Sequence, residues 1–458
     1  MHKNYKLALL LFVCFGLFIT ACKDEPTPEA TQTVATFQHT AISKWNDVFL
    51  HIERRAAGYR PGPAPRALGL IGLATYEACI NGMPEYQSLA TQYQGLSIPA
   101  ADPKTDYYWP AVASSVHEFL LRRFFSTQDD AYLAEIDKVA SELEFAFKSE
   151  TTSERVEASK AYGANVGNAI WDWSKTDKFG HDAFLDPFSN YAWQDHYAKD
   201  GDWAPTLPGP GRPIFPYWGN ARTFAIEETD KLCEKPIPYS ASPISELYAQ
   251  ALEVYARSGF NQTYEDKWIG EFWSDDILNL TFSPGPRWIA VANQVYTSKD
   301  SDLETAIVCN AKIGMALNDA AVACWHSKYY YNIERPETYI KRVIDPNYEP
   351  ALKDPQTGAT GITPSFPAYP SGHSTMGAAG AEILTSIFGN NYAMFDKCHN
   401  GRSEFLSTPR FFASFYDMAE ENAMSRIPLG VHFRMDCEVG VDLGLVCGRK
   451  VNDLPWKR

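Results

Sequence analysis

The chain has 458 residues, of which 45% are hydrophobic and 14% aromatic, so it contains enough apolar material for a large buried core. This composition excludes a chain that is mainly disordered. The formal net charge of -15 at pH 7 opposes general attraction to nucleic acid or to anionic membrane surfaces, because both carry the same sign. Any anion that the protein binds has to be captured by a local group of cations.

The first 22 residues have the pattern of a bacterial lipoprotein signal peptide. Lys3 and Lys6 precede an apolar run over residues 7–19 that is too short to span a bilayer. Small residues before Cys22 suit a cleavage that leaves Cys22 as a lipid-bearing N-terminus. We therefore expect an exported protein held in a membrane of the cell envelope, on the periplasmic side or at the cell surface, with plain secretion as the alternative. Residues 23–36 are rich in Glu, Pro and Thr and are predicted to be a flexible tether.

The remaining cysteines do not predict a metal site. None forms a Cys-x-x-Cys pair, which argues against zinc. Export permits disulfides, and the odd number of thiols allows up to three bridges with at least one thiol left over. These cysteines are Cys79, Cys233, Cys309, Cys324, Cys398, Cys437 and Cys447.

The pattern of apolar residues predicts a mainly α fold with two packed helical bundles. Residues 37–175 repeat apolar side chains every three or four positions, and this helical pattern resumes near residue 243. Between them, residues 179–245 are rich in Pro and Trp and are predicted to be a long ordered loop region. No useful length of strict alternation predicts a sheet. We therefore divide the chain into an N-terminal helical half, 37–275, and a C-terminal helical half, 276–458.

One helix is predicted in detail in the C-terminal half. Ser301 and Glu304 have the spacing of a capping box, and the apolar stripe that follows ends at Trp325 and Lys328. A cation at the end of a buried row costs free energy unless it meets water or an anion. Arg335 follows Lys328 by seven positions, about two helical turns, and Pro336 disfavours helical geometry at Arg335. The two cations are predicted to flank a pocket where the helix gives way to a loop, although solvated cations near a helix end would give the same pattern.

Two further segments carry groups that bind anions. Ser371, Gly372 and His373 open a predicted helix over 374–388, whose free backbone N–H groups and positive dipole end favour an anion, and Ser371 adds a hydroxyl donor. In the segment 425–436, His432 and Asp436 are four positions apart and would share one helical face. Asp436 would then accept a hydrogen bond from one ring nitrogen of His432 and orient the other toward a ligand.

The three segments together read K-x6-R-P, P-S-G-H and S-R-x5-H-x3-D. In this combination the chain resembles the superfamily of vanadium-dependent haloperoxidases and type 2 phosphatidic acid phosphatases, most of all the bacterial vanadium iodoperoxidases. A looser similarity extends the resemblance to more than half of the mature chain, at Trp203-Ala-Pro-Thr, Pro216-Tyr-Trp-Gly and Phe272-Trp-Ser-Asp.

The resemblance implies a vanadate cofactor. Its oxygens would be bound by Lys328, Arg335, Ser371, the backbone N–H of Gly372, and Arg426. In a haloperoxidase His432 would bond the vanadium, whereas in a phosphatase the same atom would attack phosphorus. His373 would be the acid and base beside the apical oxygen.

Two aromatic residues favour the haloperoxidase over the phosphatase. Trp325 and Phe366 have the spacing at which haloperoxidases line the halide side of the cofactor, although both would also suit a core. The implied reaction is oxidation of halide by hydrogen peroxide to hypohalous acid, with Lys328 polarising the peroxide oxygen. Phe366 stands where some members carry histidine, which disfavours a simple bromoperoxidase. The resemblance favours an iodoperoxidase over a chloroperoxidase, with bromide as a further substrate.

Two alternatives remain at this point. A lipid-anchored acid phosphatase would use the same pocket with His432 as nucleophile, and phosphate is expected to compete with vanadate in either enzyme. A scaffold that only binds an oxyanion would not require both His373 and an oriented His432.

Overall fold

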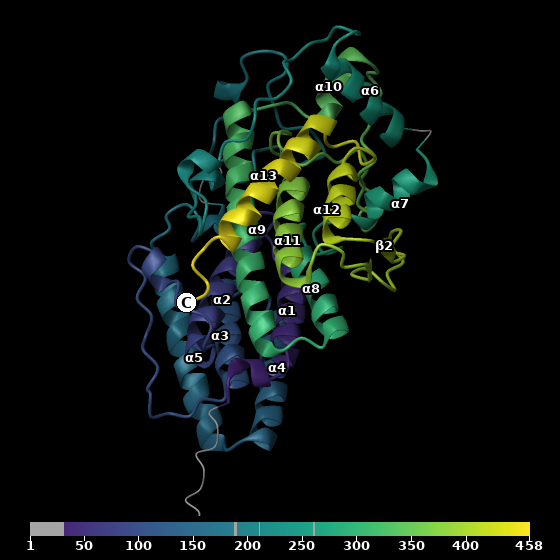
Figure 1. Cartoon of the computed structure of the whole chain (residues 1–458). Helices are drawn as coiled ribbons and strands as arrows, with labels where there is room; N and C mark the ends of the chain where they lie inside the picture. Colours follow the sequence, from purple (N-terminus) through teal and green to yellow (C-terminus); the bar gives the residue numbers. More distant parts are fainter. Residues whose placement is uncertain (1–31, 187–189, 210, 260–261) are drawn as a thin grey trace, which may run out of the picture. The chain divides into compact units, whose positions relative to one another are not determined.

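The computed structural model describes residues 32–186, 190–209, 211–259 and 262–458. Within them the chain is mainly helical, as predicted, with thirteen α-helices and one two-stranded antiparallel hairpin (Figure 1). The predicted signal peptide with Cys22, and the tether up to residue 31, lie outside the described residues. The fold already begins within the stretch expected to be a tether, because Val34 is buried in a short 3-10 turn.

The elements of the first half are η1 (Val34–Thr36), α1 (Thr40–Glu53), α2 (Pro63–Cys79), η2 (Ile80–Gly82), η3 (Ala90–Gln92), α3 (Trp109–Phe124), α4 (Asp130–Glu150) and α5 (Ser153–Ser174). The following region holds η4 (Ala183–Leu185), η5 (Trp193–His196), η6 (Trp218–Asn220) and η7 (Glu228–Asp230). The remaining elements are α6 (Glu246–Ser258), α7 (Tyr264–Phe272), α8 (Arg287–Lys299), α9 (Leu303–Tyr331), α10 (Pro336–Val343), α11 (Gly372–Phe388), β1 (Met394–Asp396), β2 (Arg410–Phe412), α12 (Phe415–Met424) and α13 (Arg434–Asn452). The strands have three residues each, too few for alternation to reveal them in the sequence.

The Pro- and Trp-rich region has no α-helix in its described residues and is packed by its aromatic side chains, as predicted. Trp203 and Trp218 are fully buried. The region is tied to α9 by the buried carboxylate of Asp319, which accepts hydrogen bonds from the backbone N–H groups of Phe224, Ala225 and Ile226 at 2.7–3.1 Å. Backbone polar groups that a long loop would otherwise leave unpaired are satisfied in this way.

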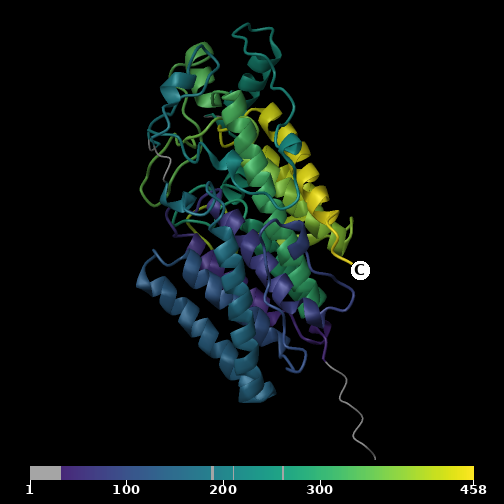
Figure 2. The same cartoon turned by 90° about the vertical axis from the view of Figure 1, so that its left-hand side faces the viewer.

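Helix α9 is the centre of the fold. It packs against α2 on one side and against α11 and α13 on the other (Figures 1 and 2). A Cβ at Gly314 would lie 2.5 Å from the carbonyl oxygen of Leu68, so glycine is what allows α9 and α2 to approach so closely. The helix is long and apolar enough to cross a membrane, but 89% of its most apolar window is buried inside the protein, which is typical of a core helix.

The predicted cap of α9 is wrong by one residue. The side chain of Asp302 accepts a hydrogen bond from the backbone N–H of Thr305 at 2.7 Å, and the helix begins at Leu303. Ser301 therefore lies outside the helix, and Glu304 is a residue of its first turn rather than the partner in a capping box. Two adjacent residues that both suit a cap made the sequence ambiguous.

The second bundle brings the starts of α11 and α13 together. A Cβ at Gly444 of α13 would lie 2.1 Å from the carbonyl oxygen of Thr375 in α11, so the two helices touch at backbone distance. The backbone N–H of Ser371 donates to the carbonyl oxygen of Asp436 at 2.8 Å, which joins the first turns of both helices. All seven described cysteines are free thiols, so none of the bridges that the composition allowed is formed among them.

Candidate functional site

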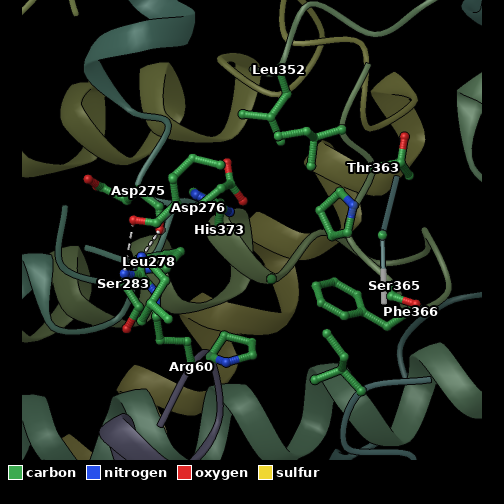
Figure 3. Close-up of a pocket in the computed structure, with 18 of the residues that line it drawn as sticks. Arg60, Asp275, Asp276, Leu278, Ser283, Leu352, Thr363, Ser365, Phe366 and His373 are labelled. Atoms are coloured by element: carbon green, nitrogen blue, oxygen red, sulfur yellow. Dashed lines mark hydrogen bonds between the residues drawn. The ribbon is translucent and has the colours of Figure 1, made fainter. Parts of the chain in front are cut away.

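A cavity of about 340 Å³ lies where the loop 274–284, the segment 362–366 and the start of α11 meet. In Figure 3 His373 and Asp276 lie on one side of this cavity and Phe366 lies on the other. His432 and Arg426 also line it. Residues of the second and third sequence motifs thus line the cavity, and Arg335 of the first motif reaches them through its contact with Nε2 of His432 at 3.0 Å.

Lys328 is fully buried near the end of α9. Its Nζ donates to the carbonyl oxygens of Pro367 and Ala368, each at 2.8 Å. It makes no ion pair with the residues that the structure describes. Burial lowers the pKa of Lys328, because nothing negative in the immediate contacts offsets the loss of water.

Arg335 lies outside the helices, as the following proline predicted. It is the N-cap of α10, with φ -78° and ψ 154°. Its Nε donates to the carbonyl oxygen of Phe366 at 2.9 Å, and its Nη1 lies 2.8 Å from the carbonyl oxygen of Val431 and 3.0 Å from Nε2 of His432. The other terminal nitrogen, Nη2, is buried without a partner. Burial lowers the pKa of Arg335 to about 9.

The start of α11 matches the prediction. Ser371 is the N-cap and its Oγ accepts a hydrogen bond from the backbone N–H of Ser374 at 3.3 Å. Gly372 is the first residue of the helix, where backbone N–H groups have no partner within the helix. A Cβ at Gly372 would lie 3.2 Å from the ring of Trp325, so a side chain here would press on that indole.

His432 and Asp436 make the predicted contact, but not on one helical face. Helix α13 begins at Arg434, so His432 precedes it. Nδ1 of His432 lies 2.9 Å from Oδ2 of Asp436, which also accepts from the backbone N–H of Phe433 at 3.0 Å. Because the carboxylate accepts a hydrogen bond from Nδ1–H, it favours the tautomer with the proton on Nδ1. The lone pair of Nε2 then faces Arg335. Burial, followed by the cations Arg335 and Lys328, lowers the pKa of His432 far below 6.5, so this ring is neutral at pH 7.

His373 and Arg426 meet at a backbone carbonyl that the sequence did not single out. Nε2 of His373 lies 3.0 Å from the carbonyl oxygen of Ser274, and Nη1 of Arg426 donates to the same oxygen at 3.3 Å. Arg426 also pairs with the carboxylate of Asp276 at 2.8 Å, while its Nε is buried without a partner. Burial lowers the pKa of His373 well below 6.5, and the charge of Arg426 adds to the effect.

A buried ion network fastens the segment that carries Ser274 and Asp276. Between them, Asp275 accepts from Arg287 at 2.9 Å and lies 3.0 Å from Nε2 of His399. Arg287 also pairs with Asp396 at 2.7 Å and lies 3.9 Å from the ring centroid of Trp273. Burial opposes ionisation of Asp275, but Arg287 and His399 outweigh it and lower the pKa of that carboxyl. In the sequence, only the similarity of Phe272-Trp-Ser-Asp to haloperoxidases pointed to this segment.

Arg60, from the first half of the chain, holds the same segment from the other side. Its guanidinium donates to four backbone carbonyl oxygens at 2.6–3.3 Å, those of Asp275, Ile277, Thr281 and Phe282. The predicted boundary between the two halves cuts between Asp275 and Asp276. Both halves therefore contribute to the position of His373 and Arg426.

Trp325 and Phe366 form one wall of the cavity. Their ring centroids are 4.9 Å apart at an interplanar angle of 54°. The Nζ of Lys328 lies 5.1 Å from the ring centroid of Phe366, and the guanidinium carbon of Arg335 lies 4.9 Å from it. The two aromatic rings therefore separate the apolar part of the cavity from the buried cations.

The charges and free donors fit a tetrahedral oxyanion. Three buried basic groups, Lys328, Arg335 and Arg426, face the carboxyl groups of Asp276 and Asp436. Burial lowers the pKa of Lys328 and raises the pKa of Asp436, each to about 7, so the site keeps one excess positive charge whether these two groups are both charged or both neutral. Two guanidinium nitrogens at the site, Nη2 of Arg335 and Nε of Arg426, have no partner, and such donors cost free energy unless a ligand accepts from them. The described residues contain no group of three or more His, Cys, Asp or Glu that would hold a metal cation.

Comparison with known proteins agrees with this geometry. Residues 309–455 match the model of the VCPO second helical-bundle domain. The chain is 24% identical to the vanadium chloroperoxidase of Curvularia inaequalis, over 87% of this chain and 79% of that protein. Together with the fold, these matches support the resemblance of the chain to the vanadium haloperoxidase superfamily.

Two solved structures are similar over most of their length. A bacterial vanadium-dependent iodoperoxidase is 27% identical, with a TM-score of 0.79 over 91% of this chain and 97% of that one. A bacterial vanadium-dependent chloroperoxidase in its holo form is 16% identical, with a TM-score of 0.60 over 87% of this chain and 94% of that one, which is a likeness of fold.

Proposed function

We propose that this protein is a vanadium-dependent haloperoxidase that binds vanadate in the cavity beside His432 and oxidises iodide with hydrogen peroxide. The observation that carries the proposal is the set of buried, partly unpaired cations that converges on a neutral histidine. In this assignment Lys328, Arg335, Ser371, Gly372 and Arg426 bind the vanadate oxygens, and His432 bonds the vanadium. A bound vanadate would supply a Lewis acid that activates hydrogen peroxide toward halide without a change in the oxidation state of the metal.

The residues of this chain prepare the site for that anion. Asp436 holds the proton of His432 on Nδ1, so Nε2 keeps a lone pair, which accepts from Arg335 in the structure and would bond the vanadium once the cofactor displaces that contact. Lys328 and Arg335 both have a lowered pKa through burial, and an anion beside them would raise it again because opposite charge favours the charged form. Because burial lowers the pKa of Lys328 to about 7, vanadate binding is expected to take up a proton at this amine near neutral pH.

His373 is proposed as the acid and base of the reaction. Its hydrogen bond to the carbonyl oxygen of Ser274 means that Nε2 carries the proton in the neutral ring. To transfer that proton to a substrate oxygen, Nε2 has to exchange the carbonyl for the substrate. Burial, together with the charge of Arg426, lowers the pKa of His373 and keeps the ring neutral until then.

Iodide is proposed as the preferred halide, with bromide second. The aromatic wall of Trp325 and Phe366 is a surface that suits a large, weakly hydrated, polarisable anion, and the cations behind it supply the attracting charge. The similar bacterial iodoperoxidase supports the same choice.

We also propose that the protein is exported and anchored through lipid on Cys22. Replacing Cys22 by Ser should release the protein from membranes, whereas persistence in the membrane fraction would refute the anchor.

An acid phosphatase is the second candidate, and the size of the cavity favours it. A volume of about 340 Å³ exceeds what peroxide and a halide need, and a phosphomonoester requires room for its leaving group. His432 would then be the nucleophile, with phosphorus in the place of vanadium.

The test compares both reactions on the soluble chain that begins at Lys23. Oxidation of iodide, bromide and chloride by peroxide is measured after incubation with vanadate, beside phosphomonoester hydrolysis without vanadate. Iodide oxidation that requires vanadate and is suppressed by phosphate is the expected result. Phosphomonoester turnover without oxidation of any halide would instead establish the phosphatase, and His432→Ala should abolish whichever activity is present.

A further inference from the structure

A methionine lies in the wall of the cavity, one helical turn after His373. Met376 is on α11 and is 1% exposed. Its methyl carbon is 3.8 Å from the point where a Cβ at Gly372 would lie, and its sulfur is 3.1 Å from the corresponding point at Gly285. The thioether is thus packed against the glycine whose N–H is proposed to bind the cofactor.

Met376 is the only residue with a sulfur atom among those that line this cavity, all of which lie in the described part of the chain. A thioether is readily oxidised to a sulfoxide by oxidants that transfer two electrons. The rest of the wall offers carboxylates, aliphatic side chains, aromatic rings and two histidines. If an oxidant forms beside His373, the thioether of Met376 is the most easily oxidised side chain in the surrounding wall.

We propose that Met376 is a site of turnover-linked oxidation, at which hypohalous acid formed in the cavity converts the thioether to a sulfoxide. This inference rests on the proposed haloperoxidase activity. The sulfur donates an electron pair to the halogen of hypohalous acid, the halogen–oxygen bond breaks and hydroxide leaves. The hydroxide then attacks the sulfur, the halide leaves, and loss of the remaining proton gives the sulfoxide. One thioether and one hypohalous acid give one sulfoxide, one halide ion and one proton, so sulfur is oxidised by two electrons and the halogen is reduced by two.

The sulfoxide would damage the site from within. It replaces a flexible apolar group by a polar group that is larger by one oxygen, in a wall that is packed against Gly372 and Gly285. An added oxygen at this point presses on the start of α11. The expected consequence is loss of vanadate binding. The enzyme would therefore lose activity in proportion to the number of turnovers that it has completed.

Burial separates this oxidation from damage by oxidant in the surrounding solution. Met376 is 1% exposed and lies in the wall of the cavity, so oxidant reaches it only through the cavity, whereas Met394 lies on the hairpin outside the cavity lining and is only half-buried. Oxidant added to the solution should reach Met394 first. Oxidant formed inside the cavity should reach Met376 first.

The experiment follows both methionines by peptide mass spectrometry. The full chain, loaded with vanadate, is given peroxide and iodide, and samples are stopped with free methionine at increasing turnover. Met376 should gain one oxygen roughly tenfold sooner than Met394, and this order should reverse when hypoiodous acid is added to the vanadate-free protein. Met376 that stays a thioether while iodide is oxidised would overturn the inference, as would its oxidation by peroxide without iodide. Absence of iodide oxidation would instead refute the proposed function on which the inference rests.

A matched pair of variants tests the consequence. Met376→Leu should raise the number of turnovers before half of the activity is lost by roughly twofold or more, because leucine fills a similar volume and has no sulfur. Met418→Leu is the control, since Met418 is equally buried in α12 but does not line the cavity. Equal lifetimes of the two variants and the unmodified protein would contradict a role of Met376 in inactivation.

Discussion

Removing the carboxylate of Asp276 should destabilise the protein in a way that an oxyanion reverses. Arg426 is 1% exposed, and Asp276 is the only acidic side chain that pairs with it among the described residues. In Asp276→Ala the guanidinium keeps one contact, the carbonyl oxygen of Ser274 at 3.3 Å. Loss of one partner from a buried ion pair costs about 3–5 kcal/mol, because the remaining charge stays out of water without compensation.

This cost translates into a measurable change in melting temperature. For a compact unit of the size of residues 33–458, the unfolding entropy is about 0.9 kcal/mol/K, so the variant should melt about 3–6 °C lower than the unmodified protein. Vanadate should raise the melting temperature of Asp276→Ala more than that of the unmodified protein, since the bound anion supplies a negative charge beside Arg426.

Thermal unfolding with and without vanadate measures both effects. Glu142→Ala is the control, because Glu142 pairs with Lys44 at 3.5 Å on the surface with both side chains nearly half exposed, and such pairs contribute less than about 1 kcal/mol. The reasoning is refuted if Asp276→Ala melts within about 1 °C of the control, or if vanadate raises the melting temperature of all three proteins equally.

Three further predictions concern the site and the core. Lys328→Ala should weaken vanadate binding, measured by equilibrium dialysis, whereas His373→Ala should reduce turnover more than binding, and an equal loss of binding in both would contradict their assigned roles. Gly372→Ala should weaken vanadate binding roughly tenfold, because the new Cβ would lie 3.2 Å from the Trp325 ring and shift the start of α11; an affinity within about twofold would count against it. Burial lowers the pKa of His117 from 6.5 to about 3, so the unfolded state takes up the proton first, and stability is lost as the pH falls from 6.5 toward 3. At pH 5 the loss is about 2 kcal/mol, and urea unfolding at pH 7 and pH 5 should show a correspondingly smaller difference in His117→Gln, while an unchanged difference would refute this origin.

The sequence predicted six of the 23 residues that line the cavity, among them both histidines and Arg426, because each motif carries its chemistry in a short segment. Pro336 indicated that Arg335 leaves the helix, and Ser371 and Gly372 indicated a helix start, since both effects depend on local backbone geometry. Local geometry also explains two errors. Asp302 rather than Ser301 caps α9, and His432 reaches Asp436 from outside α13, because neighbouring residues of similar propensity do not fix a helix boundary to one position.

The partners that hold these groups in place could not be predicted from the sequence. Asp276 is separated from Arg426 by about 150 positions, and Arg60 reaches its carbonyl acceptors across more than 200. Backbone carbonyls such as that of Ser274 have no signature at all, since every residue carries one. The unbridged cysteines are a similar case, because spacing alone does not tell which thiols face one another.

The sequence by itself determined the helical class of this protein and the chemical groups available for binding an oxyanion, because periodicity, caps and motif residues act over a few positions. Only the tertiary structure decided that three buried basic groups converge with two unpartnered guanidinium nitrogens, that His373 and Arg426 share one carbonyl, and that Met376 lies against Gly372. The physical reason is that burial and pairing set the pKa and the free donors of these groups, and both depend on which distant segments pack together.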